Sequence, residues 1–256
     1  MSVGAVVALS LTSCSAEGTG ASGFSLVSPG KLTCAVQADY PPFSFVEGDQ
    51  RVGFEVDLCA EIAQKIDVEP VLVPTEFADL IDSVNSDQSD VILGSMTATD
   101  ARSEQIDFGD IYYRSAADVF VKSDSPLSSP TNLDGATLGV KKGTTFADAA
   151  AALPGVGSIS EYAENPDVIQ ALVAGEVQAI FVSGLFVSYY KNLGQLDARG
   201  LGVQVMTDSA STGFKKNNTE LLDAVNSAIT EISEDGTYEE LSQKWFGIPQ
   251  ANEIGQ

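Results

Sequence analysis

The sequence predicts an α/β protein with two lobes, on three observations. Apolar, strand-like runs alternate with amphipathic helical stretches along most of the 256 residues. A loop rich in Ser, Pro, Asn and Asp, from Ser123 to Gly135, marks a boundary near residue 120. A polar turn follows a strand once on each side of that boundary. With 44% hydrophobic and 19% charged residues, the chain is globular, and its length allows one large core or two modest ones.

The first half of the chain reads as strand, helix, strand, helix and strand. The expected strands are Leu32–Gln37, Val68–Val73 and the apolar run from Val91, and the expected helices are Gly53–Ile66 and Glu76–Ser86. This order predicts a largely parallel sheet, with binding loops at the carboxyl ends of the strands. The acid Glu55 is interpreted as favourable helix-start electrostatics.

The segment after Val91 has the layout of an anion site. Gly94 and Ser95 follow the strand, and Thr97 and Arg102 come within one short turn or helix start. Hydroxyls and free N–H groups at a strand end bind anions, and an arginine can pair with a carboxylate through two hydrogen bonds. The alternative is a surface pairing of Arg102 with a neighbouring acid: Asp100, Glu104 or Asp107.

The second half of the chain has the same arrangement of a strand followed by a polar turn. The strand Ala136–Val140 leads into Gly143, Thr144 and Thr145 at a helix start, where N–H groups and hydroxyls again face outward. An N-cap role for Thr144 or Thr145 explains the same residues. Further elements are expected as helices at 166–174, from 185, from 218 and from 236, and as strands at 114–122, 177–182 and 203–206.

Composition excludes several functions. The chain has 36 acidic against 13 basic residues, a net charge of −23, which argues against nucleic-acid partners. It has no histidine, so Ser–His and Cys–His nucleophilic mechanisms and His-ligated metal sites are excluded. Neither nucleotide-binding glycine motif occurs, and we expect no metal and no cofactor.

The amino terminus resembles a lipoprotein signal. A short apolar run ends in Leu11, Thr12, Ser13 and Cys14, which match a bacterial lipobox in which Cys14 is lipidated after cleavage. No Lys or Arg precedes Cys14, so we infer an upstream start codon or a trimmed sequence. An apolar tail is the alternative. Cys34 and Cys59 then remain as an even pair; an exported protein permits a disulfide, but free buried thiols are the favoured prediction.

Four separated motifs resemble those of the extracellular solute-binding proteins, family 3, of polar amino acid ABC transporters. They are GFEVDL, MTATDAR with IDFGDIYY, the Gly-Thr-Thr turn, and GTYEELSQKWFG, and the resemblance runs from about Lys31 to Gly247. It implies a periplasmic-binding-protein-like type II fold (Venus flytrap) with two hinge crossings. The expected division is a signal peptide at 1–13, a tether at 14–29, lobe 1 at 30–118 and 211–250, lobe 2 at 119–210, and a tail at 251–256.

The resemblance also implies ligand-binding residues. Thr145 and the Arg102 segment match ligand contacts of the family, Tyr40 matches an aromatic residue beside the ligand, Gln37 a polar contact to its side chain, and Phe77 a stacking residue. Core packing is the alternative role for Phe77. The complete expected set is Arg102, Thr97, Ser95, Tyr40, Phe77, Gln37, Thr145, Thr144 and Ser183.

One departure from the family pattern concerns charge. Gln178 and Ser183 stand at two usually acidic positions, the second of which holds the ligand's α-ammonium group in the family. A serine does not replace that charge. Either another acid, Glu161 or Asp208, supplies it, or the solute is not an ordinary α-amino acid.

The resemblance therefore implies a monomeric, lipid-anchored, extracytoplasmic receptor. It would capture an amino acid or related carboxylate by hinge closure and deliver it to an ABC permease with its ATPase. No catalytic residue is expected. The alternatives are an enzyme resembling cyclohexadienyl dehydratases, which needs a placed acid or base, and a ligand-sensing surface lipoprotein with the same site.

Overall fold

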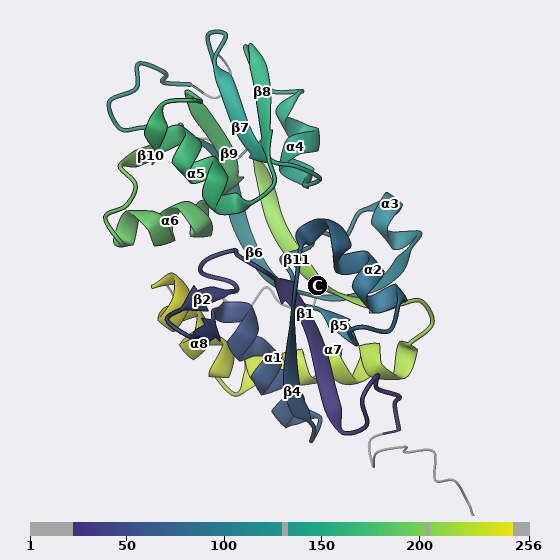
Figure 1. The fold of residues 1–256 in the computed structure, drawn as a ribbon. Coiled ribbons are helices and arrows are strands. Elements are labelled where there is room, and N and C mark those ends of the chain that lie inside the picture. Colours follow the sequence, from purple (N-terminus) through teal and green to yellow (C-terminus); the bar gives the residue numbers. More distant parts are fainter. Residues whose placement is uncertain (1–22, 130–132, 203–204, 248–256) are drawn as a thin grey trace, which may run out of the picture.

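The computed structural model describes residues 23–129, 133–202 and 205–247. These residues form two lobes, joined by two long strands that run from one into the other (Figure 1). One sheet extends through both lobes. Its main strands lie in the order β4 (Glu69–Thr75), β1 (Lys31–Gln37), β5 (Val91–Ile92), β11 (Met206–Lys215), β6 (Ile106–Lys122), β9 (Ala179–Ser183), β7 (Thr137–Lys141) and β8 (Ser158–Tyr162). The α/β fold with two lobes is thus confirmed, and the three strands expected in the first half of the chain pair in parallel as predicted. The two strands that join the lobes pair antiparallel with each other and with their neighbours, so the sheet as a whole is mixed.

Lobe 1 places helices on both faces of its strands. Its elements are β1 (Lys31–Gln37), β2 (Phe45–Glu47), β3 (Gln50–Val52), α1 (Phe54–Lys65), β4 (Glu69–Thr75), the 3₁₀ helix η1 (Phe77–Asp79), α2 (Leu80–Asn85), β5 (Val91–Ile92), α3 (Asp100–Ser103), α7 (Thr219–Glu234) and α8 (Thr237–Phe246). Alternate residues of β1 serve opposite faces: Cys34 and Val36 pack with α1, α7 and α8, and Ala35 packs with α2.

Lobe 2 has the same two-faced construction. Its elements are β7 (Thr137–Lys141), α4 (Thr145–Ala150), β8 (Ser158–Tyr162), α5 (Asn165–Ala174), β9 (Ala179–Ser183), α6 (Gly184–Asn192) and β10 (Ala198–Gly200). Apolar residues of α5 and α6 belong to the large core shared with lobe 1, while α4 covers a separate core on the other face. Both lobes therefore bring the carboxyl ends of β1, β5 and β7 toward the level where they meet (Figure 1).

The strands between the lobes are β6 (Ile106–Lys122) and β11 (Met206–Lys215). They pair with each other along most of their length; β11 also pairs with β5 in lobe 1, and β6 with β9 and β10 in lobe 2. Their pairing shifts register on both sides of Ser211. The sequence predicted a strand only from Arg114, whereas β6 begins at Ile106.

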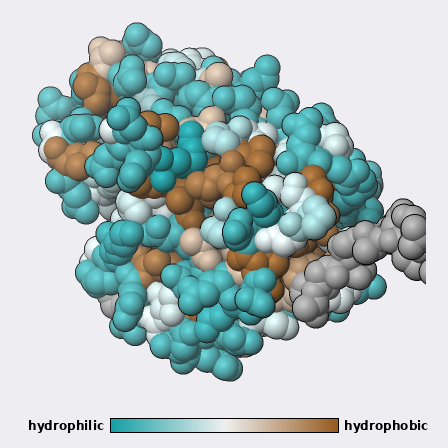
Figure 2. Space-filling model, turned by 60° about the horizontal axis from the view of Figure 1, so that its bottom comes forward, coloured by the Kyte–Doolittle hydropathy of each residue, from teal (hydrophilic) through white to brown (hydrophobic). Residues whose placement is uncertain are grey.

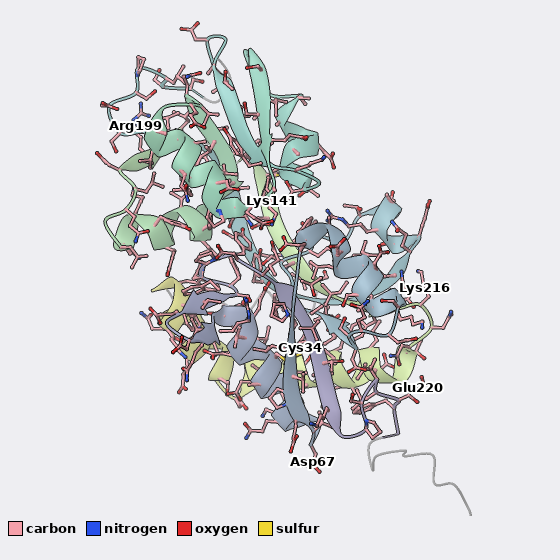
Figure 3. All side chains as sticks on the ribbon, viewed as in Figure 1. Cys34, Asp67, Lys141, Arg199, Lys216 and Glu220 are labelled. Atoms are coloured by element: carbon pink, nitrogen blue, oxygen red, sulfur yellow. A yellow bond between two sulfur atoms is a disulfide. The ribbon has the colours of Figure 1, made fainter. Side chains whose placement is uncertain are left out.

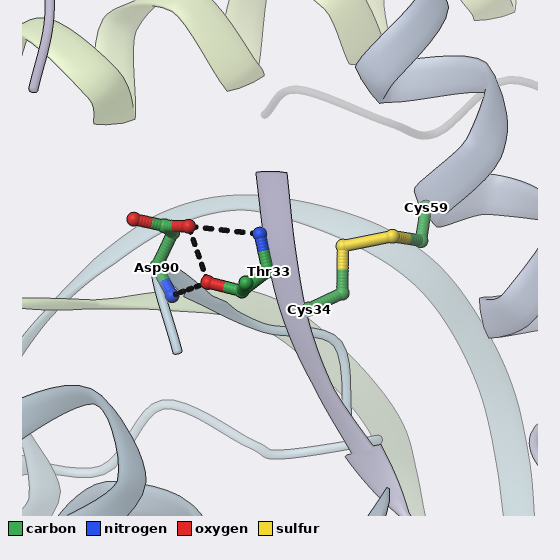
Figure 4. The surroundings of a disulfide bond; sticks show 4 residues. All are labelled: Thr33, Cys34, Cys59 and Asp90. Atoms are coloured by element: carbon green, nitrogen blue, oxygen red, sulfur yellow. Dashed lines mark hydrogen bonds between the residues drawn. A yellow bond between two sulfur atoms is a disulfide. The ribbon is translucent and has the colours of Figure 1, made fainter. Parts of the chain in front are cut away.

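Cys34 and Cys59 form a disulfide, so the prediction of free thiols is wrong (Figure 4). Their Cα atoms are 6.4 Å apart, within the range that a disulfide spans. Packing of α1 on β1 creates this distance, which the sequence does not contain. Thr33, the preceding residue of β1, bonds on the other side to the buried carboxylate of Asp90 through both its N–H and its hydroxyl.

The described chain is already packed onto lobe 1 before β1. Phe24 is buried, and the N–H of Val27 donates to Asp90 Oδ1 at 2.7 Å. Both residues fall in the range 14–29 that was assigned to the tether. The predicted lipidation site Cys14 and the tail 251–256 lie outside the described residues. None of the described helices combines the length and apolar character needed to cross a bilayer. The face in Figure 2 is largely hydrophilic, and apolar side chains gather mainly near the level where the lobes meet.

Candidate ligand-binding site

A narrow cavity lies between the two lobes, and the space within it that can hold the centre of a water-sized molecule is about 20 Å³. Its lining residues are Gln37, Tyr40, Phe77, Ser95, Thr97, Arg102, Tyr113, Lys141, Thr144, Thr145, Phe146, Asn165 and Asp208. Eight of the nine predicted residues are among them. The ninth, Ser183, is fully buried at the end of β9 and is not part of the lining. Residues more than a hundred positions apart therefore meet in one cavity.

Arg102 lies in the short helix α3, which Thr99 caps by accepting a hydrogen bond from the Arg102 N–H. Its guanidinium donates to the Thr97 carbonyl at 2.8 Å and, across the lobes, to the Gly143 carbonyl at 3.1 Å. Its carbon atom Cζ is 5.3 Å from the centre of the Phe77 ring. Burial lowers the pKa of Arg102 from its ordinary value, and an arginine keeps its positive charge in proteins.

The surface-pairing alternative for Arg102 is not what the structure has. Within the described chain, no carboxylate lies within ion-pair distance of Arg102, and Asp107 pairs with Lys216 instead. Of the five N–H donors of an arginine, two are engaged with carbonyls. The remaining donors and the full charge are available to an anion in the cavity.

Hydrogen bonds to Glu55 and Tyr112 fix the position of Ser95. Its hydroxyl donates to Glu55 Oε1 at 2.6 Å, and its N–H donates to the Tyr112 hydroxyl at 2.8 Å, which in turn donates to Glu55. Ser95 adopts a positive φ of 53°, uncommon for a residue with a side chain. Burial raises the pKa of Glu55 to about 7. Glu55 thus anchors the binding loop, a role that its interpretation as a helix-start charge missed.

The threonines of lobe 2 have separate tasks. Thr144 caps α4: its hydroxyl accepts from the Ala147 N–H at 3.3 Å and donates to the Lys141 carbonyl at 2.7 Å. The capping alternative therefore describes Thr144. Thr145 lines the same cavity, and its hydroxyl has no hydrogen-bond partner among the described residues.

Asp208 lies in β11 and is 4% exposed. The Tyr113 hydroxyl is 3.4 Å from its Oδ2, and burial raises the pKa of the carboxyl to about 6. The nearby Ser183 hydroxyl lowers the pKa of the Asp208 carboxyl and so opposes the effect of burial. The same hydroxyl forms no hydrogen bond of normal geometry with a described residue. Of the two acids considered from the sequence, Asp208 lines the cavity, whereas Glu161 is exposed on β8.

Lys141 is one of the lining residues that the sequence did not predict, together with Tyr113, Phe146 and Asn165. It ends β7, is 3% exposed, and lies where the lobes meet (Figure 3). Its ammonium group donates to Gln37 Oε1 at 3.0 Å and to Glu164 Oε2 at 3.2 Å. Gln37 also donates to the Gly94 carbonyl at 2.9 Å, so its amide orientation is fixed. The available signal was the position of Lys141 at the end of a strand, two residues before the Gly-Thr-Thr turn.

The sequence pattern of the bacterial extracellular solute-binding proteins, family 3, matches residues 32–248. The chain belongs to this family. A curated relative, the arginine-binding extracellular protein of Bacillus subtilis (strain 168), is 30% identical over 95% of both chains. The L-cystine-binding protein of Escherichia coli (strain K12) is 31% identical over 85% of this chain and 83% of its own.

A solved structure, the substrate binding protein of an amino acid ABC transporter, is 33% identical with a TM-score of 0.75. The match covers 85% of this chain and 100% of that one. These comparisons confirm the family resemblance and the two-lobed fold of this solute-binding protein. Family members are extracytoplasmic, and both curated relatives are binding proteins. Among the described residues there is no cluster of three or more His, Cys, Asp or Glu that could hold a metal ion.

Proposed function

We propose that this solute-binding protein captures an α-amino acid between its lobes and hands it to an ABC permease. One observation carries the proposal: Arg102 and the buried carboxyl of Asp208 line the same cavity. The guanidinium of Arg102 has no carboxylate partner among the described residues. A zwitterion supplies the missing partner to each: its carboxylate to Arg102 and its ammonium to Asp208. Arginine and cystine, after which the two curated relatives are named, share this zwitterionic head.

In this proposal Asp208 replaces the acid that the family has at the position of Ser183. Thr97 and Thr145 add hydroxyls from opposite lobes, and Tyr40 and Phe77 enclose the ligand with apolar surface. Two hydrogen bonds already join the lobes at the cavity, one from Arg102 to the Gly143 carbonyl and one from Lys141 to Gln37. A ligand that contacts both lobes makes more contacts when the lobes are closed, and it therefore favours the closed arrangement.

A thermal-shift screen of the purified protein against amino acids tests this proposal. A ligand at about 100 times its dissociation constant adds about 2.7 kcal/mol of stability. Arg102→Ala is expected to abolish the shift. Arg199→Ala is the matched control, because Arg199 also donates to two backbone carbonyls but lies far from the cavity (Figure 3). The proposal fails if no amino acid stabilises the protein, or if both variants respond like the wild type.

The proposal extends to the lipid anchor on Cys14 and to an ABC permease with its ATPase as partners. Mass spectrometry of the mature amino terminus tests the anchor: a diacylated Cys14 is expected, and an unmodified Met1 contradicts it. Reconstituted transport with an ABC permease and its ATPase tests the partnership: uptake of the amino acid should require this protein, and equal uptake without it contradicts the proposal.

A further inference from the structure

A chain of hydrogen bonds runs from the ligand cavity into the core of lobe 1. Ser95 lines the cavity, and its hydroxyl donates its single proton to Glu55 Oε1 at 2.6 Å. Toward the cavity, the Ser95 oxygen can therefore only accept a hydrogen bond. An α-ammonium group donates hydrogen bonds and a carboxylate does not, so Ser95 offers a partner to the ammonium end of an amino acid.

The inner end of this chain is the carboxyl group of Glu55, which is fully buried in the first turn of α1. The Tyr112 hydroxyl also donates to Oε1, at 2.6 Å, and Oε2 is buried with no hydrogen-bond partner among the described residues. No lysine or arginine of the described chain forms an ion pair with Glu55, and Lys244 on α8 pairs with Asp57 instead. A negative charge on Glu55 therefore has hydrogen-bond donors but no cation beside it.

The other titratable groups around Glu55 supply no positive charge either. Tyr112 on β6 and Tyr40 after β1 are phenols, and burial raises the pKa of each. Asp208 on β11 is an acid, and its charge disfavours ionisation of Glu55. Burial is the main reason that the pKa of Glu55 rises to about 7, so this carboxyl is about half protonated at neutral pH. A cation that binds beside Ser95 would shift this balance toward the ionised form.

We propose that Glu55 is a positioning residue that ionises when the α-ammonium group of an amino acid binds, and that it acts on the ligand through the Ser95 hydroxyl. The proton of the carboxyl goes to the solvent. The ammonium group then donates to Ser95, which donates to the carboxylate, and both hydrogen bonds become stronger because each involves a charged group. Asp208 lines the cavity itself, so two buried acids share the task for which Ser183 has no charge. The inference rests on the proposed amino acid capture and adds a proton that binding releases.

Calorimetric titration at pH 7 counts this proton when the heat is compared between buffers of different ionisation enthalpy. Arginine and glutamine are the probes, because they share the α-ammonium group and differ in side-chain charge. The wild type is expected to release up to about half a proton per amino acid bound, the fraction that Glu55 holds at its pKa. Glu55→Gln, whose amide oxygen still accepts from Ser95, should release only about a tenth, the share of Asp208 with its pKa of about 6.

The affinity should depend on pH through the same group. Binding lowers the pKa of Glu55 and releases its proton, so the affinity of the wild type should rise by up to about tenfold from pH 6 to pH 8. The affinity of Glu55→Gln should rise by no more than about twofold over this range, the part due to Asp208. Glu61→Gln removes a partly exposed acid of the same helix, and as the matched control it should follow the wild type.

A second variant keeps the test decisive if Glu55→Gln does not fold. Ser95→Ala leaves the carboxyl of Glu55 in place and removes the hydroxyl that joins it to the cavity. This variant should bind the probes more weakly, and its proton release at pH 7 should fall to the level expected of Glu55→Gln.

The outcomes separate this inference from the proposed function. If Glu55→Gln or Ser95→Ala releases as many protons at pH 7 as the wild type, or if the wild type releases none, Glu55 does not ionise on binding, and amino acid capture still stands. Binding of no amino acid at all, or binding that survives Arg102→Ala, overturns the proposed function itself.

Discussion

The buried carboxyl of Glu55 leads to a prediction about stability. Replacement by glutamine keeps the oxygen that accepts from Ser95 and Tyr112 and removes the charge. The pKa of Glu55 rises from 4.5 to about 7 in the folded protein, because burial disfavours the ionised form. Since the folded state holds this proton at higher pH than the unfolded chain, stability decreases as pH rises through this window and levels off above about 7.

The magnitude follows from the same two pKa values. Each pKa unit corresponds to about 1.4 kcal/mol, so Glu55 lowers the free energy of unfolding by about 2 to 3 kcal/mol between about pH 5 and about pH 8. Glu55→Gln is expected to lack this decrease. Urea unfolding at the two pH values, followed by Trp245 fluorescence, measures the difference.

The control is Glu61→Gln, a partly exposed acid in the same helix, for which the pH dependence should follow the wild type. If Glu55→Gln keeps the full pH dependence of the wild type, the carboxyl is not the titrating group, and the proposed origin of the effect is refuted.

Three further predictions concern the disulfide, the cavity acid and a turn. Cys34→Ser removes the crosslink to Cys59, which spans a sequence separation of 25 residues. It is expected to lower the free energy of unfolding by about 3 kcal/mol, and reduction of the wild-type disulfide should lower it by the same amount. The affinity for the amino acid ligand should fall up to about tenfold per pH unit below about 6, where Asp208 becomes protonated, and Asp208→Asn should bind weakly without that dependence in calorimetry. Gly53→Ala should destabilise the protein by more than about 1 kcal/mol in urea unfolding, because the φ of Gly53 is 138° and a Cβ atom there would lie 2.2 Å from the backbone oxygen of Phe43. Gly48 has a φ of 63° and open space around it, so Gly48→Ala should destabilise the protein less.

Local patterns were sufficient for most of the fold. The helix α7 shows a strong amphipathic stripe and was expected from residue 218, one residue before it begins. The strand β8 was missed because its sequence, SISEY, lacks an apolar run and its side chains are at most partly buried. The disulfide was missed because it depends on the packing of two elements and not on either sequence segment.

Two sources predicted residues that line the cavity. Arg102 and the surrounding hydroxyl residues follow a strand in a polar turn, and Gln37 was expected from the family resemblance. Lys141 was missed because a lysine in a polar turn reads as a solvated charge, and only the meeting of the lobes buries it. Asp208 was one of two acids considered, and the choice between them required the position of β11 beside the cavity.

The most direct test of the account is a calorimetric titration with three related compounds: the best-binding amino acid, the amine that lacks its α-carboxylate, and the acid that lacks its α-ammonium group. If Arg102 and Asp208 each hold one end of a zwitterion, each analogue should bind at least about 100-fold more weakly than the amino acid. Equal binding of either analogue would contradict the account, and the analogue that still binds would identify which of the two residues had been assigned incorrectly.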